Sequence, residues 1–246
     1  MTAGVTVGMS GYLRMVRDWL YDAGRKHVQA ESNFMLAVLD ALVGLCTLWL
    51  LLTLCMGCGM AHGAEIPRGA AIHRATLVKS AHAFWGLDAP VATFAAQVQA
   101  ESWWNPKDKS AVGAQGLAQF MPATAKWLPQ VVPAVGNADP WNPAWSLRAL
   151  VAYDKWLWDR AVAVNDCERM AFTLSAYNGG EGWVKRDKAL AKRKGLDTMR
   201  WWGNVATVNA GRSKGNWKEN RDYPDRILLN FEPLYERAAW GTGMCP

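Results

Sequence analysis

The glutamate at position 101 is the side chain of this sequence best placed to do chemistry. It lies in the stretch QVQAESWWNPKDKSAVGAQGLAQFMPATA, residues 97–125, at the end of an apolar helical pattern. Because Glu101 stands three residues after Val98 and seven after Phe94, the helical period puts its carboxyl on the apolar face. Burial and the negative end of a helix both disfavour a charged carboxyl, which predicts a raised pKa and a general acid. The alternative, on position alone, is an ordinary helix-end glutamate that reaches water.

A turn and a loop bracketed by glycines follow this glutamate. Asn105 and Pro106 are expected to end the helix. Gly113 and Gly116 stand three apart, where the backbone can turn sharply or approach a ligand without a clash at Cβ. The amide of Gln119 can both donate and accept hydrogen bonds. This pattern favours a binding loop next to the candidate acid.

Four blocks of this sequence, in order, resemble the motifs of one family. ESWWNP, GAQGLAQFMPATA, SAYNGG and ENRDYPDRIL are similar to those of the soluble lytic transglycosylases, which cleave the glycan strands of bacterial peptidoglycan. The resemblance implies a mainly α, lysozyme-like (goose-type) helical catalytic domain. It also implies cleavage of the MurNAc–GlcNAc β-1,4 bond with formation of 1,6-anhydro-MurNAc, formally a carbon–oxygen lyase reaction.

The matched positions imply a role for each candidate site residue. Glu101 resembles the single catalytic acid and base of the family. Ser102 and Asn105 would orient or support it, whereas Glu219 and Arg221 look structural. The positions for which the resemblance implies contact with substrate or support of the groove are Ser102, Asn105, Gln119, Tyr177, Asn178 and Tyr223.

Three positions depart from the family's motifs. Ala118 stands where the family usually has Met, Gly179 where it has Ala, and Asn220 where it has Thr. These departures bear on substrate affinity and rate more than on the type of reaction.

A second carboxylate is the feature that most glycosidases need and that this sequence does not supply clearly. Asp108 is nearest in sequence, but it lies in a charged KDK turn and is expected to be solvated. The family's reaction needs one acid only, because the 6-hydroxyl of the substrate closes the anhydro ring. The alternatives are a lysozyme-like peptidoglycan hydrolase, a non-catalytic wall-binding protein and a nucleic-acid binder.

Helices must position these residues, since no run shows the alternation of a strand. Asp88 is expected to cap the helix of Glu101, with Pro90 in its first turn. Asn142 and Pro143 predict the start of another helix in the same way. A third helix is expected over residues 168–177, stopped by Asn178-Gly179-Gly180.

The N-terminal part of the chain predicts a membrane attachment. Residues 41–61 are 21 residues without a charge, long enough to cross a bilayer as a helix. An uncleaved anchor is favoured over a signal peptide because the apolar run is long and begins late. The expected organisation is an N-terminal segment (1–40), a transmembrane helix or signal anchor (41–61) and a lytic transglycosylase catalytic domain (65–246). The catalytic domain is then exported, facing the periplasm from the inner membrane or lying in a virion membrane if a phage encodes it.

Two of the five cysteines fall outside the apolar run in the part expected to be exported. A disulfide between Cys167 and Cys245 would tie the C-terminal tail to a helix. Sequence alone does not bring their Cα atoms within bridging distance, so a bridge and two free thiols both remain.

The distribution of charge and of possible metal ligands indicates which binding partners to expect. Residues 185–200 hold seven basic and two acidic residues, most of the net charge of +6, and would attract a polyanion or form a solvated helix face. We expect peptidoglycan glycan strands as the partner and no nucleic acid. The four histidines form no ligand spacing, so no metal and no cofactor are expected.

Overall fold

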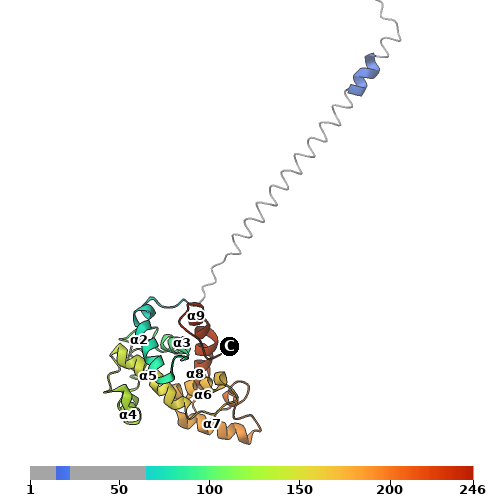
Figure 1. Cartoon of the computed structure of the whole chain (residues 1–246). Coiled ribbons are helices and arrows are strands. Elements are labelled where there is room, and N and C mark those ends of the chain that lie inside the picture. Colours follow the sequence, from blue (N-terminus) through green and yellow to red (C-terminus); the bar gives the residue numbers. More distant parts are fainter. Residues whose placement is uncertain (1–14, 23–64, 246) are drawn as a thin grey trace, which may run out of the picture. The chain divides into compact units, whose positions relative to one another are not determined.

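The structure, a computed structural model, describes residues 15–22 and 65–245. The chain divides into two compact units, Met1–Gly63 and Ala64–Pro246. In the first unit, residues 15–22 form the helical segment drawn in blue in Figure 1. The predicted membrane helix, residues 41–61, lies outside the described residues, as does most of segment 1–40. Within the described ranges, no helix combines the length and apolarity needed to cross a membrane.

The second unit is built from helices and short helical turns. In chain order these are α2 (Arg68–Trp85), α3 (Val91–Ser102), α4 (Pro122–Val131), η1 (Pro133–Val135), α5 (Pro143–Trp158), α6 (Asp166–Gly179), α7 (Glu181–Arg193), η2 (Val205–Thr207), α8 (Lys214–Pro224), η3 (Asp225–Phe231) and α9 (Glu232–Arg237). In residues 65–245 the only β-type pairing is two isolated bridges in the loop after α3. The predicted mainly α class is therefore confirmed for this unit.

Helix α3 forms the buried centre of this unit. Its residues Phe94, Ala95, Ala96 and Val98 have no exposed surface. Helices α2 and α5 pack against it, as do α9 and η3, and Figure 1 shows α3 between α2 and α9. Because burial of apolar surface is the main force that holds such a helix in place, its last turn is a rigid support for a polar side chain.

The bounds of α3 differ from those predicted at both ends. Asp88 is exposed and does not cap the helix, whose N-cap is Pro90 without a side-chain hydrogen bond. The amide of Ala92 instead donates to the carbonyl of Thr242 from the C-terminal tail. The helix ends at Ser102, before Asn105 and Pro106, because Trp103 adopts a left-handed φ of 52°.

The start of α5 agrees with the prediction. Asn142 caps the helix, and its Oδ1 accepts hydrogen bonds from the amides of Ala144 and Trp145, with Pro143 as the first helical residue. Helix α6 covers the predicted range 168–177 and extends it by two residues at each end. It is capped by Asn165 and stops at Gly180, whose φ of 92° favours glycine.

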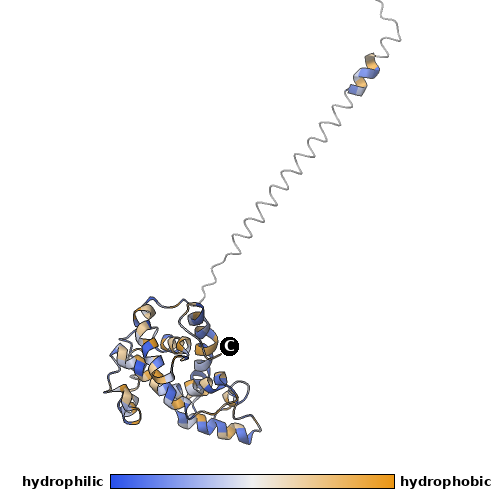
Figure 2. Cartoon of the chain, in the orientation of Figure 1, coloured by the Kyte–Doolittle hydropathy of each residue, from blue (hydrophilic) through white to orange (hydrophobic). Residues whose placement is uncertain are grey.

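Helix α7 is amphipathic and lies at the edge of the unit. Its buried residues are Val184, Asp187 and Ala191, spaced by three and four. Figure 2 shows hydrophilic residues along most of the rest of this helix. Most basic residues of this helix therefore lie on its outer side, which both interpretations of the charged cluster allow.

The C-terminal tail is fastened to α6. Cys167 and Cys245 form a disulfide, with their Cα atoms 4.7 Å apart. The bridge that the sequence left open is thus present. Since Thr242 of the same tail meets α3, the disulfide also holds the tail against the start of that helix.

Candidate active site

Glu101 lies on the last turn of α3 and borders a cleft of about 350 Å³. The cleft is formed by the end of α3, the loop that follows it, the start of α4, and parts of α5, α6 and α8. Of the predicted site residues, it brings together Glu101, Gln119, Tyr177, Asn178 and Tyr223. These come from segments far apart in sequence, so the cleft exists only in the folded unit.

The carboxyl of Glu101 is held by a tyrosine. The hydroxyl of Tyr223, a residue only 2% exposed, donates to Oε1 of Glu101 at 2.5 Å. Burial raises the pKa of Glu101 to about 7, although the bond from Tyr223 and the charge of Arg226 lower it. The raised pKa predicted from the apolar stripe is therefore confirmed, with burial as its main cause. At neutral pH this carboxyl can both give and receive a proton.

Two charged residues of the cleft were not predicted as site residues. Glu219 and Arg226 both line it, and they act in opposite directions on the pKa of Glu101: Glu219 raises it and Arg226 lowers it. The family resemblance implied a structural role for Glu219. The spacing of 219, 223 and 226, four and then three residues, would place all three on one helical face, which is the signal that could have found them.

A further carboxyl is buried behind the cleft. Asp154 of α5 has no exposed surface, and Nε2 of Gln97 donates to its Oδ1 at 3.4 Å. Burial raises its pKa well above the ordinary value, and the charge of Glu101 adds to the rise. Asp154 does not border the cleft, so substrate would not reach it.

The loop between α3 and α4 is tied to its surroundings by several of the predicted residues. The Oγ of Ser102 donates to the carbonyl of Leu117 at 2.8 Å, and the hydroxyl of Tyr177 donates to that of Ala118 at 2.7 Å. Nε2 of Gln119 donates to the carbonyl of Gly116 at 3.0 Å. Gly116 has a φ of 72°, and a Cβ there would lie 1.9 Å from the carbonyl oxygen of Pro140. The close approach expected of this glycine is thus to protein backbone.

Two predicted residues lie beside the cleft and do not line it. Ser102 is buried, so its contact with the loop supports the position of Glu101 from behind. Asn105 is exposed, and its Oδ1 accepts a hydrogen bond from the amide of Lys107 at 3.0 Å, which stabilises the turn after α3.

Asn178 lies at the junction of the cleft with a second hollow. That hollow is bordered by Trp183 of α7 and by Arg212, and it shares Val112, Asn178 and Glu219 with the cleft. The two hollows are therefore adjacent and together form a longer depression that passes Asn178.

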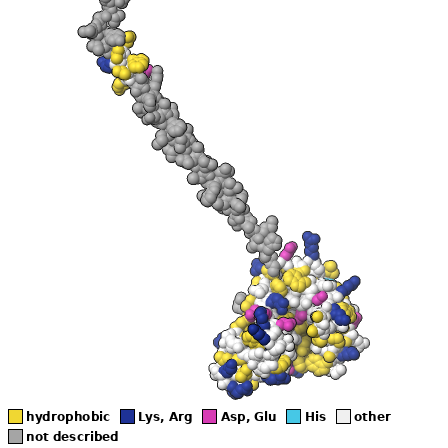
Figure 3. Space-filling view, turned by 180° about the vertical axis from the view of Figure 1, so that it is seen from behind, with side chains coloured by type: hydrophobic (Ala, Val, Ile, Leu, Met, Phe, Trp, Pro, Cys, Tyr) yellow, Lys and Arg dark blue, Asp and Glu magenta, His cyan; other side chains and the backbone are white. Residues whose placement is uncertain are grey.

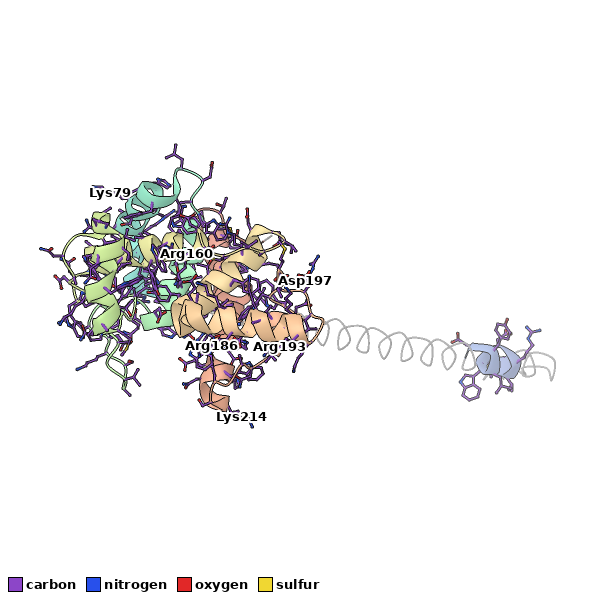
Figure 4. The ribbon with its side chains drawn as sticks, turned by 90° about the horizontal axis from the view of Figure 1, so that it is seen from below. Lys79, Arg160, Arg186, Arg193, Asp197 and Lys214 are labelled. Carbon is purple, nitrogen blue, oxygen red and sulfur yellow. A yellow bond between two sulfur atoms is a disulfide. The ribbon has the colours of Figure 1, made fainter. Side chains whose placement is uncertain are left out.

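The basic residues of α7 do not enter the cleft. Arg186 stacks on the ring of Trp183, and Lys185 pairs with Glu181. Figure 4 shows Arg186 and Arg193 spaced along α7, and Figure 3 shows Lys and Arg side chains spread over the visible face. Over residues 15–22 and 65–245, no group of three or more His, Cys, Asp or Glu residues could hold a metal ion.

Comparison with known proteins gives consistent results over this part of the chain. The family described as "Transglycosylase SLT domain" matches residues 81–200. The chain is 34% identical over 108 residues to "Membrane-bound lytic murein transglycosylase F" of Vibrio parahaemolyticus, covering 44% of this chain and 19% of that protein. It is 29% identical over 158 residues to the protein of the same name from Desulfosudis oleivorans, covering 59% and 33%. The chain thus spans a fifth to a third of the length of these relatives.

A solved structure shares the fold. The 70-kDa soluble lytic transglycosylase in complex with bulgecin A superposes with a TM-score of 0.50 at 23% identity. The match covers 72% of this chain and 26% of that one. This likeness concerns the fold alone.

Proposed function

We propose, from the match of residues 81–200 to the transglycosylase SLT domain family, that the chain is a peptidoglycan lytic transglycosylase. It would cleave the MurNAc–GlcNAc β-1,4 bond and leave a 1,6-anhydro-MurNAc end, opening the bacterial cell wall locally. The observation that carries the proposal is the carboxyl of Glu101, which lines the cleft and whose pKa burial raises to about 7.

In the proposed reaction one proton leaves Glu101 and one returns. The protonated carboxyl gives its proton to the bridging oxygen as the bond from that oxygen to C1 of MurNAc breaks. The resulting carboxylate takes the proton of the sugar's 6-hydroxyl while O6 bonds to C1 of the oxocarbenium-like ring. Because a pKa near the working pH serves both steps, the burial of Glu101 supports this role.

The other residues of the cleft would hold the glycan strand. Gln119, Tyr177, Asn178 and Tyr223 border the cleft. The donor groups of Gln119, Tyr177 and Tyr223 are used within the protein, so their oxygens would accept hydrogen bonds from sugar hydroxyls. Ser102 and Asn105 would act from behind, by fixing the turn and the loop next to Glu101.

A lysozyme-like hydrolase is the alternative favoured by one observation. Glu219 lines the same cleft, and a hydrolase would need such a second carboxylate to activate water. The fate of the sugar end separates the two reactions, since hydrolysis leaves a reducing end and transglycosylation does not.

We also propose that the domain works outside the cytoplasm, attached to a membrane through residues 41–61. The relatives are named as membrane-bound proteins. The disulfide between Cys167 and Cys245 supports export, since such bridges persist in oxidising compartments. Retention of the intact chain in the membrane fraction, with the domain open to added protease in spheroplasts, would test this placement.

Mass spectrometry of the products released from purified sacculi tests the proposed reaction. The full chain should release muropeptides with 1,6-anhydro ends, and Glu101→Gln should slow their release roughly 10²- to 10⁴-fold. Glu219→Gln is the matched control, because it should keep the anhydro product. Reducing ends from the full chain, lost in Glu219→Gln, would mean a hydrolase instead. Release at full rate by Glu101→Gln would rule out the assigned acid.

A further inference from the structure

Two of the three departures from the family motifs touch each other in the structure. Gly179 is the last residue of α6 and Asn220 lies on α8, and these helices pack side by side. A Cβ added at Gly179 would lie 2.7 Å from Nδ2 and 3.3 Å from Cγ of Asn220. The backbone of Gly179 is helical, so space and not conformation is what demands glycine there. The two departures are therefore one local arrangement, in which the glycine makes room for the asparagine.

The amide of Asn220 has only one favourable orientation. Its Oδ1 faces two donors, Nη1 of Arg221 at 2.6 Å and Oγ of Ser175 at 2.9 Å. Since arginine can only donate, the group that faces it must be the amide oxygen. The Nδ2 of Asn220 then faces two acceptors, the carbonyl of Ser175 at 2.8 Å and Oδ1 of Asn178 at 3.0 Å.

A buried charge cluster anchors this orientation. The carboxylate of Asp187, with no exposed surface, accepts from Nη2 of Arg221 at 2.8 Å and pairs with Arg212. Arg221 also donates to the carbonyls of Ala206 at 2.9 Å and Val208 at 2.8 Å. With its guanidinium held on several sides, Arg221 cannot turn away from Asn220 without leaving buried charge unpaired.

The orientation of the Asn178 side-chain amide follows from that of the Asn220 amide. Its Oδ1 is taken up by the Nδ2 of Asn220, so its own NH₂ group must point away from Asn220. Asn178 is exposed and borders both the cleft of Glu101 and the adjoining hollow. It therefore presents two N–H donors to whatever occupies the depression.

We propose that Asn220 is a positioning residue that fixes Asn178 as a hydrogen-bond donor toward the glycan, and that Gly179 provides the space for it. The ligand group that fits is an acceptor oxygen of the sugar, such as an acetamido carbonyl. The choice of a glycan as ligand rests on the proposed function, whereas the contact between the two positions does not. A threonine at 220 would not fix the orientation of the Asn178 amide, because a hydroxyl donates and accepts equally well.

Glycan binding by a set of four proteins tests whether Gly179 makes room for the side chain of Asn220. All four proteins are the full chain with Glu101→Gln, which suppresses turnover. They are this parent, Gly179→Ala, Asn220→Thr and the combined variant, and the measurement is the Kd for glycan strands freed of peptide. Gly179→Ala should raise Kd about tenfold by displacing the amide of Asn220, and Asn220→Thr should raise it by a similar factor. The combined variant should be no weaker than Asn220→Thr alone, within about twofold, because the clash is gone. Losses that multiply would overturn the proposal.

Gly182→Ala is the matched control for the added methyl group. Gly182 lies on the neighbouring helix α7, and a Cβ there meets no atom within 4 Å. It should leave Kd unchanged and should hold or raise the unfolding midpoint, because alanine is favoured over glycine in a helix.

Asn178→Asp tests the polarity directly. The new carboxylate can still accept from Nδ2 of Asn220, so the unfolding midpoint should hold or rise. It can no longer donate to the sugar, so Kd should rise roughly tenfold. The reverse result, an unchanged Kd with a lower midpoint, would mean that the oxygen of Asn178 faces the cleft and would overturn the proposal.

Failure of the proposed function would look different. If the parent protein bound no glycan, the functional proposal would fall. The side-chain amide resonances of Asn178 and the unfolding midpoints of the four proteins would then still show whether Asn220 and Gly179 control the position of the Asn178 amide. A resonance of Asn178 that does not move in Asn220→Thr, with additive changes in midpoint, would refute it.

Discussion

The hydroxyl of Tyr223 donates a hydrogen bond to Oε1 of Glu101 at 2.5 Å, across 122 residues of sequence. This bond joins the end of the buried helix α3 to α8, and it points the carboxyl into the cleft. It also favours the ionised carboxyl, and so opposes the effect of burial on the pKa. The pKa of Glu101 is thus set by two opposing effects, burial at the end of α3 and the hydrogen bond from Tyr223 of α8.

Tyr223→Phe removes this donor and keeps the ring. The pKa of Glu101 should rise above 7, because the ionised carboxyl loses a hydrogen bond. Activity that needs protonated Glu101 falls as pH rises through that pKa, so its alkaline limb should move to higher pH. The maximal rate should fall about tenfold, because the carboxyl loses its orientation. A pH–rate profile measures both, and Tyr153→Phe, another tyrosine of the cleft, should leave the limb in place. A limb that moved to lower pH in Tyr223→Phe would contradict this account.

Glu219→Gln and Arg226→Gln should move the pKa of Glu101 in opposite directions. Removing the negative charge of Glu219 lowers that pKa, whereas removing the positive charge of Arg226 raises it. The alkaline limb of the pH–rate profile should move by up to about one pH unit, down for Glu219→Gln and up for Arg226→Gln. Lys218→Gln removes an exposed charge of α8 that pairs with Asp222, and serves as the control. Shifts of the same sign in both variants would mean that the changes act through structure and not through charge.

Gly116→Ala should be far more destabilising than Gly113→Ala. Both residues have a positive φ, 72° and 94°, so each substitution strains the backbone by about 1–2 kcal/mol. A Cβ at Gly116 would also overlap the carbonyl of Pro140, whereas one at Gly113 meets nothing within 4 Å. The overlap should lower the free energy of unfolding by about 1–3 kcal/mol more. Urea unfolding of the two variants measures the difference, and equal losses would show that the loop yields easily.

Loss of the disulfide should loosen the start of α3. The bridge between Cys167 and Cys245 closes a sequence separation of 78 residues, and its removal should lower the free energy of unfolding by about 2–4 kcal/mol. The amide of Ala92, which donates to Thr242 of the tail, should then exchange its hydrogen faster. Hydrogen exchange of the Cys167→Ser/Cys245→Ser double variant, compared with the parent protein with and without reductant, measures this. A parent protein whose gel mobility is the same with and without reductant would show that the bridge is absent.

The helical class could be predicted from local pattern, whereas the residues of the cleft followed from the resemblance of four sequence blocks to one family. The cap at Asn142 with Pro143 and the stop of α6 near Gly180 are local events, decided by side-chain hydrogen bonds and backbone conformation within a few residues. The start of α3 was mispredicted because its free amide finds a carbonyl at Thr242, far along the chain. Its end was mispredicted because Trp104, with a positive φ, places its ring in the core beside Tyr235 and Trp240.

The sequence by itself determined that Glu101 lies on the same face of α3 as Phe94 and Val98, because of the period of the helix. That a buried carboxyl has a raised pKa then follows from desolvation alone. Only the tertiary structure decided which groups surround it. Tyr223, Glu219 and Arg226 reach Glu101 from the C-terminal third of the chain, and the contact of Gly179 with Asn220 depends on how α6 and α8 pack. Charge and hydrogen bonding act through distance in space, and the packing of apolar surfaces over the whole unit sets those distances.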